Sequence, residues 1–141
     1  MTLPNKTTKN QRQKKNYAKK EIGNIGEKIA VKYLKDCGYK ILEKNFRKRY
    51  GEIDIVALKK NGFFSKNKEL IFIEVKTKTK NKGYNPEENI NFRKRKNLIK
   101  TAKYYILKNK YNINWRIDTI IIELDPITRK ANLRHIKNAV Y

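Results

Sequence analysis

Three short runs rich in β-branched residues constrain the fold of this chain more strongly than any other feature. They are Glu52–Leu58, Leu70–Lys76 and Trp115–Leu124, and apolar residues fill most positions of each run instead of alternate ones. Runs of this kind predict strands covered on both faces, because a strand with one solvated face alternates polar and apolar residues. The turn signal Asn61-Gly62 lies between the first two runs, which therefore predict an antiparallel pair.

Helical periodicity precedes and interrupts these strands along the chain. Apolar residues recur at helical spacing from about 22 to 37 and again from about 90 to 108. Shorter extended segments are expected at residues 39–46 and 133–136. The resulting order α-β-β-β-α-β-β predicts one α/β domain over residues 21–141, with a central mixed β-sheet flanked by helices.

The charge of the chain is extreme, because 36 Lys and Arg stand against 13 Asp and Glu for a net charge of +23. Residues 1–20 contain seven of these cations and no acid, which leaves +16 on the rest. This first segment has no repeating apolar face and predicts a basic, disordered N-terminal arm. A domain this basic attracts a polyanion, either nucleic acid or an anionic membrane surface. The alternative is a merely solvated lysine-rich surface, since the residue usage also fits A·T-rich codons.

Several other functional classes are disfavoured by composition. The single cysteine, Cys37, excludes an intrachain disulfide and a cysteine-based zinc site, and it fits a reducing compartment. No apolar run approaches the ~18 residues that span a membrane, and the N-terminus lacks the apolar stretch of a secretory signal. No amphipathic helix with an aromatic face suggests membrane-surface binding. We therefore expect a cytoplasmic protein that binds nucleic acid and no membrane.

Two acidic residues interrupt the apolar strands. An ionised carboxylate at Asp54 or Glu74 costs several kcal/mol inside a strand unless a cation or hydrogen-bond donors compensate it. Strand alternation places Asp54 on the side of Glu52, and Glu74 on the side of Lys76. If the strands pair, two carboxylates and one ammonium converge on one face, which suits a hard cation such as Mg²⁺. The spacing alone equally fits an ordinary ion pair between Asp54 and Lys76.

Sequence blocks in a characteristic order carry a family resemblance. The strongest are the Gly-x-x-Gly-Glu block at 23–27, the Gly-Glu-Ile-Asp block at 51–54 and the Glu-Val-Lys-Thr block at 74–77. Weaker matches are Gly83–Glu87, Lys94 with Leu98 and Ala102, Arg116–Asp118 and His135–Ala139. Over about residues 21–140 the chain resembles the YraN family (UPF0102). That family is similar in layout to archaeal Holliday junction resolvases, and the resemblance implies a restriction-endonuclease-like fold of the PD-(D/E)xK superfamily.

The resemblance also implies roles for individual residues. Asp54, Glu74 and the backbone carbonyl of Val75 match metal ligands, so that Mg²⁺ or Mn²⁺ is the expected cofactor. Lys76 matches the catalytic lysine, and Glu27 matches the helix-borne glutamate that completes the acidic cluster, often through water. These roles describe a site in which a cation activates water against a phosphodiester. Glu52 either supports the metal ligand Asp54 from behind without binding the metal itself, or is simply a solvent-facing residue at the start of the strand.

Basic residues beside the expected site are candidate phosphate contacts. Arg93, Lys94, Arg95 and Lys96 open the second predicted helix, and Lys78 stands where relatives often have arginine. We expect these five side chains to contact nucleic-acid phosphates, and the alternative is a solvated helix face.

Two further polar residues are assigned to structure. His135, the only histidine, is expected to have a structural role, and Asp118 is expected to be a buried hydrogen-bonding residue without a metal.

Two functional hypotheses follow from these residues. The first is a metal-dependent nuclease that hydrolyses phosphodiester bonds in DNA, including branched DNA. A junction substrate would favour a symmetric homodimer, because two strands are cut at related positions. The alternative is a non-catalytic nucleic-acid-binding module that retains the nuclease fold.

Overall fold

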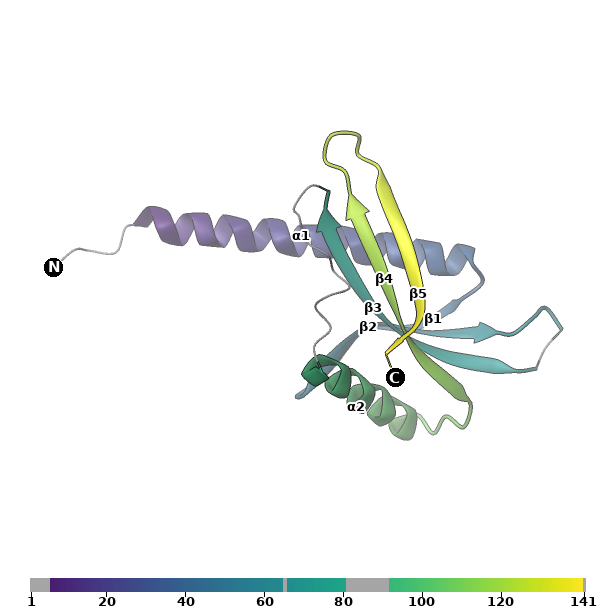
Figure 1. Ribbon diagram of the computed structural model, residues 1–141. Coiled ribbons are helices and arrows are strands. Elements are labelled where there is room, and N and C mark those ends of the chain that lie inside the picture. Colours follow the sequence, from purple (N-terminus) through teal and green to yellow (C-terminus); the bar gives the residue numbers. More distant parts are fainter. Residues whose placement is uncertain (1–5, 65, 81–91, 141) are drawn as a thin grey trace.

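Five strands form one mixed sheet with a helix on each face in the computed structural model, which describes residues 6–64, 66–80 and 92–140 (Figure 1). The order of elements along the chain confirms the predicted α-β-β-β-α-β-β sequence. The elements within the described residues are α1 (Lys6–Asp36), β1 (Lys40–Lys48), β2 (Gly51–Lys60), β3 (Lys68–Thr79), α2 (Phe92–Lys108), β4 (Asn114–Leu124) and β5 (Ala131–Val140).

The strands lie in the sheet in the order in which they occur in the sequence. Strands β1, β2 and β3 are successively antiparallel, which confirms the predicted pairing of β2 with β3. Strands β3 and β4 are parallel, with α2 between them in the chain, and β5 returns antiparallel to β4. A five-stranded mixed sheet flanked by two helices is the predicted α/β class, and it is consistent with a restriction-endonuclease-like fold.

Each face of the sheet carries its own hydrophobic core. On the face that we call the α2 face, Leu98, Ala102 and Tyr105 of α2 pack with strand residues that include Phe72. On the opposite α1 face, Ala30 and Leu34 of α1 pack with Ile55, Ile71, Ile73, Ile120 and Ile122. Because both faces are covered, the middle strands are apolar at successive positions, as the sequence predicted.

Helix α1 begins earlier than predicted. The structure describes residues 6–20 as helix continuous with the predicted helix, whereas the sequence predicted a disordered arm over 1–20, and residues 1–5 lie outside the described residues. The segment is rich in lysine and glutamine, which are good helix formers, so the helix propagates from the part packed on the sheet. It carries no apolar stripe because it projects beyond the sheet (Figure 1). The prediction of disorder was wrong here because it relied on the missing stripe alone.

The strand ends also differ from the predicted ones. Strand β3 extends to Thr79, because its parallel pairing with β4 continues to the partners Thr79 and Leu124. The Gly83–Glu87 block lies outside the described residues. Within the described part of the chain, no helix is long and apolar enough to cross a membrane.

Candidate functional site

The candidate site lies where strands β2 and β3 separate. Their regular pairing runs from Lys60 opposite Lys68 to Ile55 opposite Ile73 and ends there. At the next position the backbone N–H of Val75 donates a hydrogen bond to Oδ2 of Asp54 at 2.7 Å. The Asp54 side chain therefore accepts the hydrogen bond that a backbone carbonyl of β2 would accept in a regular sheet. Beyond this point the two strands separate, and we call the opening between them, at Asp54 and Glu74, the fork.

A cavity of about 250 Å³ occupies this fork on the α2 face of the sheet. Asp54 and Glu74 line it from the two strands, and Lys94 and Asn97 line it from α2. The fork thus brings together the two carboxylates that the sequence singled out. The remaining lining residues are Tyr50, Gly51, Glu52 and Leu98.

Asp54 is held in an environment that disfavours its charge. Burial raises the pKa of Asp54, and the bond from the Val75 N–H opposes this rise only in part. The charges of Glu27, Glu74 and Glu52 add to the rise, and together these causes bring the pKa of Asp54 to about 7. A carboxylate in this setting favours a proton or a cation as its partner.

Glu74 is compensated on only one of its two oxygens. The residue is 7% exposed, and its Oε1 forms an ion pair with the ammonium of Lys94. Its Oε2 is buried and has no hydrogen-bond partner among the described residues. A buried oxygen without a partner is costly, and a cation bound at this oxygen would remove the cost.

Gly26 determines how closely α1 approaches the site. A Cβ at Gly26 would lie 1.8 Å from Oγ1 of Thr77, so only glycine allows the helix to pass against β3 here. The next residue, Glu27, is thereby held near Asp54, whose pKa its charge raises. Its Oε2 accepts a long hydrogen bond from Nδ2 of Asn45 at 3.5 Å, and the side chain lines a groove between α1 and β1.

Gly51 performs the same task for α2 on the other side of the site. A Cβ at Gly51 would lie 2.5 Å from Oγ1 of Thr101 and 3.2 Å from the carbonyl oxygen of Asn97. The start of β2 is therefore in close contact with α2, and Asn97 and Lys94 reach the cavity. Gly26, of the Gly-x-x-Gly-Glu block, thus allows α1 to approach the site, and Gly51, of the Gly-Glu-Ile-Asp block, allows α2 to do so.

The donor set fits a hard cation, although the site is not a preformed three-carboxylate cluster. Among the described residues, no group of three or more His, Cys, Asp and Glu side chains is placed to hold a metal ion. Asp54 and Glu74 provide carboxylate oxygens at the fork, the exposed Glu52 lines the cavity but pairs with Arg47, and Glu27 lies near Asp54 from α1. One or two carboxylates with retained waters are the usual protein share of a Mg²⁺ site.

Comparison with known proteins places the chain in a family. The model of the "Uncharacterised protein family UPF0102" matches residues 26–122, which include Glu27, Asp54 and Glu74. The chain belongs to the UPF0102 family. A UPF0102 protein of Clostridium botulinum is 45% identical over 127 residues, covering 87% of this chain and 96% of the relative.

Relatives in other organisms match over a similar length. A UPF0102 protein of Clostridioides difficile is 45% identical over 120 residues, covering 85% of this chain and 96% of the relative. One of Alkaliphilus oremlandii is 37% identical over 121 residues, covering 85% and 97%.

The basic residues predicted for this UPF0102 protein have different surroundings. Arg93, Arg95 and Lys96 are exposed on the first turns of α2, whereas Lys94 turns to Glu74. Lys78 forms an ion pair with Glu123 at 2.9 Å, a contact that the sequence did not indicate.

Three further predicted site residues are placed as follows. Lys76 is half-buried on β3, two residues beyond Glu74, and is not part of the cavity wall. Val75 contributes its N–H to Asp54. Glu52 lines the cavity but is exposed, and it forms an ion pair with Arg47 at 3.1 Å. The sequence did not single out Tyr50, Asn97 or Asn45, because an uncharged polar residue gives no signal until its neighbours are known.

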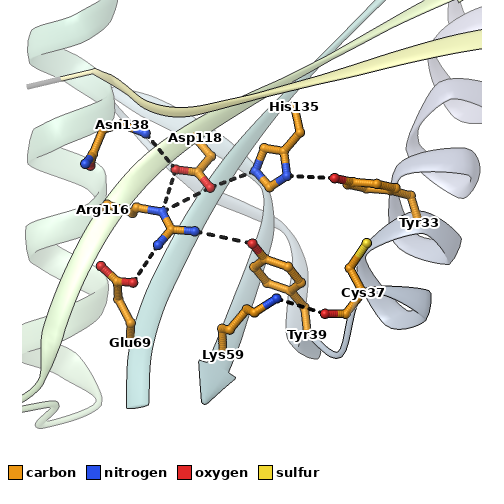
Figure 2. Close-up of polar contacts among 9 residues, drawn as sticks. All are labelled: Tyr33, Cys37, Tyr39, Lys59, Glu69, Arg116, Asp118, His135 and Asn138. Atoms are coloured by element: carbon orange, nitrogen blue, oxygen red, sulfur yellow. Dashed lines mark hydrogen bonds and ion pairs between the residues drawn. The ribbon is translucent and has the colours of Figure 1, made fainter. Parts of the chain in front are cut away.

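A second polar cluster lies on the α1 face of the UPF0102 sheet (Figure 2). Asp118 is fully buried and accepts hydrogen bonds from Nε of Arg116 at 2.9 Å, Nε2 of His135 at 2.7 Å and the N–H of Asn138 at 3.0 Å. Burial would raise the pKa of Asp118, but these donors outweigh it and hold the pKa below its ordinary value. The prediction of Asp118 as a buried hydrogen-bonding residue is confirmed.

The same cluster links three strands to α1. Arg116 continues from Asp118 to Oε2 of Glu69 at 2.5 Å and to the hydroxyl of Tyr39 at 3.3 Å. Because an ionised carboxylate can only accept, Nε2 of His135 donates to Asp118, and Nδ1 forms a hydrogen bond with the Tyr33 hydroxyl at 3.2 Å. Each of these polar groups has a protein partner, which supports the structural role expected for His135.

Proposed function

We propose that this UPF0102 protein is a metal-dependent nuclease that hydrolyses phosphodiester bonds in DNA. The incompletely compensated pair of the half-buried Asp54 and the buried Glu74, in a chain of net charge +23, carries this proposal. A strongly basic protein has ample cations to neutralise two carboxylates, yet Lys94 pairs with Oε1 of Glu74 while Oε2 has no hydrogen-bond partner among the described residues. The remaining carboxylate oxygens suit a divalent cation.

The residues of the fork have distinct roles in this proposal. Asp54 and Glu74 would hold Mg²⁺ or Mn²⁺, together with the carbonyl of Val75. When bound, the cation would polarise the scissile phosphate and lower the pKa of an attacking water. Lys76 would orient that water or stabilise charge that develops on the phosphate, and Glu27 would complete the acidic environment from α1.

Helix α2 provides the surface on which the DNA backbone would lie. Lys94 lines the cavity, and Arg93, Arg95 and Lys96 are exposed on the same turns of the helix. Contacts of this kind fix the position of the phosphate backbone without reading its sequence. A strand that enters the cavity would therefore meet Lys94 beside the two carboxylates, and the other three cations would be available to the backbone outside it.

Cleavage assays test the proposal directly. Purified protein would be incubated with four-way junction, flap and linear DNA in Mg²⁺ or Mn²⁺, with Asp54→Asn and Glu74→Gln as site variants. The matched control is Asp36→Asn, which removes an exposed carboxylate on α1 that forms an ion pair with Lys32. We expect cleavage by wild type and control and at least a hundredfold loss, roughly, in the site variants. Absence of cleavage with both cations, or equal cleavage by Asp54→Asn, would contradict the proposal.

A non-catalytic nucleic-acid-binding module is the second candidate. The lack of a three-carboxylate group among the described residues and the ion pair from Lys94 to Glu74 favour it, because an internal ammonium already serves as a cation there. Its signature would be salt-dependent DNA binding that Asp54→Asn leaves unchanged, without cleavage of any substrate.

A further inference from the structure

The turn between β2 and β3 carries two aromatic side chains that the fold does not use. Phe63 and Phe64 are each 93% exposed, and their rings contact each other edge to face at 5.0 Å between centroids. The turn itself is made by Asn61-Gly62, where Gly62 adopts a positive φ of 95°. Adjacent large apolar side chains in full contact with water indicate a surface that binds something.

The same turn is strongly basic. Lys60, Lys66 and Lys68 are exposed, and the sequence from 59 to 68 contains no acidic residue. Lys60 and Lys68 are direct cross-strand partners, and like charges in this position destabilise a strand pair. A bound anion would relieve this repulsion, so the lysines point to a polyanionic partner.

The β2–β3 turn projects beyond the neighbouring strands, and the base of its hairpin is held by contacts with the rest of the protein. Neighbouring β1 pairs with β2 only as far as Leu58, and β4 pairs with β3 only from Glu69, so the turn has free sides (Figure 1). At its base Lys59 donates to the carbonyl oxygen of Cys37 at 2.9 Å and lies over the ring of Tyr39 (Figure 2). This contact fixes the hairpin against the end of α1.

We propose that Phe63 and Phe64 form a stacking platform for unpaired bases of a nucleic acid, with Lys60, Lys66 and Lys68 contacting its phosphates. Base faces are accessible in single strands, loops and junctions but not inside a duplex, and aromatic rings in a cationic setting bind them with little sequence preference. Asp54 lies six residues from Lys60 along β2, roughly 20 Å at the rise of a strand, so the platform contacts the substrate away from the reacting phosphate. This inference rests on the proposed function for its choice of nucleic acid over an anionic membrane.

Binding measured without cleavage tests the platform. Fluorescence anisotropy would follow labelled oligothymidine of about 20 nucleotides and a blunt duplex of the same length in EDTA, which prevents hydrolysis. The double variant Phe63→Ala with Phe64→Ala should bind the single strand at least about fivefold more weakly and the duplex less than about twofold more weakly. The control Ile127→Ala removes another exposed apolar side chain, in the β4–β5 turn, and should bind like wild type.

Two conservative pairs separate stacking from simple apolar burial. Tyrosine at both positions keeps the ring faces and should preserve binding of the single strand, whereas leucine at both keeps apolar area without a ring and should bind as weakly as alanine. Wild-type affinity in the alanine or the leucine pair would overturn the inference. A second outcome would also overturn it. If wild type bound vesicles containing about one-third phosphatidylserine, and the alanine pair lost vesicle binding but kept its affinity for oligothymidine, the turn would be a membrane contact. Failure of cleavage alone would refute only the proposed function, since this assay excludes hydrolysis.

Discussion

Two aspartates on opposite faces of the same sheet, the half-buried Asp54 and the fully buried Asp118, have very different surroundings. On the α1 face, Asp118 accepts from three donors, and its pKa lies below the ordinary value. On the α2 face, Asp54 accepts one backbone N–H, has carboxylates for neighbours, and burial raises its pKa to about 7. Burial alone therefore does not determine the state of a carboxylate, because the number and charge of its neighbours decide the direction.

The difference separates a structural site from a candidate functional site. The network around Asp118 is complete within the protein, so an additional ligand has nothing to contribute there. The fork around Asp54 and Glu74 is incomplete, because one oxygen of Glu74 lacks a partner among the described residues. If this distinction is correct, removing the two aspartates should change the free energy of unfolding in opposite directions.

The largest effect is expected at Asp118. Asp118→Ala leaves Arg116 and His135 buried without their shared acceptor and should lower the free energy of unfolding by about 3–5 kcal/mol, measured by urea denaturation. The same change at the exposed Asp36 should cost less than about 0.5 kcal/mol. A small decrease in the free energy of unfolding for Asp118→Ala would show that this hydrogen-bond network contributes little to stability. The contrast drawn between Asp118 and Asp54 would then be wrong.

A stabilisation is expected at Asp54. In EDTA at about pH 8, Asp54→Asn removes a charge that the fold disfavours and should raise the free energy of unfolding by roughly 2–4 kcal/mol. Asparagine retains an oxygen that can accept the Val75 N–H. Added Mg²⁺ should stabilise wild type but not this variant. If Asp54→Asn instead lowered the free energy of unfolding in EDTA, Asp54 would be a structural residue like Asp118.

The two aspartates also predict opposite pH dependences. Because the native state holds an extra proton on Asp54, its contribution to stability falls as the pH rises from about 4 to about 7. The lowered pKa of Asp118 gives a contribution that is complete above its ordinary pKa and is lost as the pH falls through the folded-state value. Thermal unfolding of the single variants between about pH 3 and pH 8 would separate the two slopes.

The smallest effect is expected at Lys94. Lys94→Met removes the ammonium from Glu74 and should cost about 1–2 kcal/mol in EDTA, a value moderated by the half-exposed lysine. Mg²⁺ should recover most of this loss if the cation occupies the fork, and the control Lys103→Met, on the exposed side of α2, should show neither effect. A loss that Mg²⁺ does not reduce would mean that the ion pair itself completes the site.

Much of the fold was predictable because helices, strands and tight turns depend on residues that are close together in the sequence. Apolar runs such as Leu70–Lys76 identified the strands, and Asn61-Gly62 identified the antiparallel pair. Asp118 was recognisable as a buried polar residue from its position in an isoleucine-rich strand. The helical residues 6–20 were missed because helix propagation from an anchored segment needs no apolar stripe of its own.

The sequence singled out residues of the candidate site but did not indicate their contacts. Strand alternation and family resemblance identified Asp54 and Glu74, yet neither indicated that the strands part there and that Val75 donates to Asp54. The approach of Gly26 to Thr77 and the turn of Lys94 towards Glu74 depend on how helices pack on the sheet. Such contacts join residues far apart in the sequence, where periodicity carries no information.

Six consecutive residue pairs of β2 and β3 lie between the fork and the β2–β3 turn. They separate the two ends of the hairpin, so that a change in the structure of the turn need not alter the structure of the fork. Register is fixed by the pairs themselves, so the turn can lengthen, shorten or change its side chains without moving Asp54 or Glu74. A change of side chains at the turn would therefore leave the geometry of Asp54 and Glu74 intact.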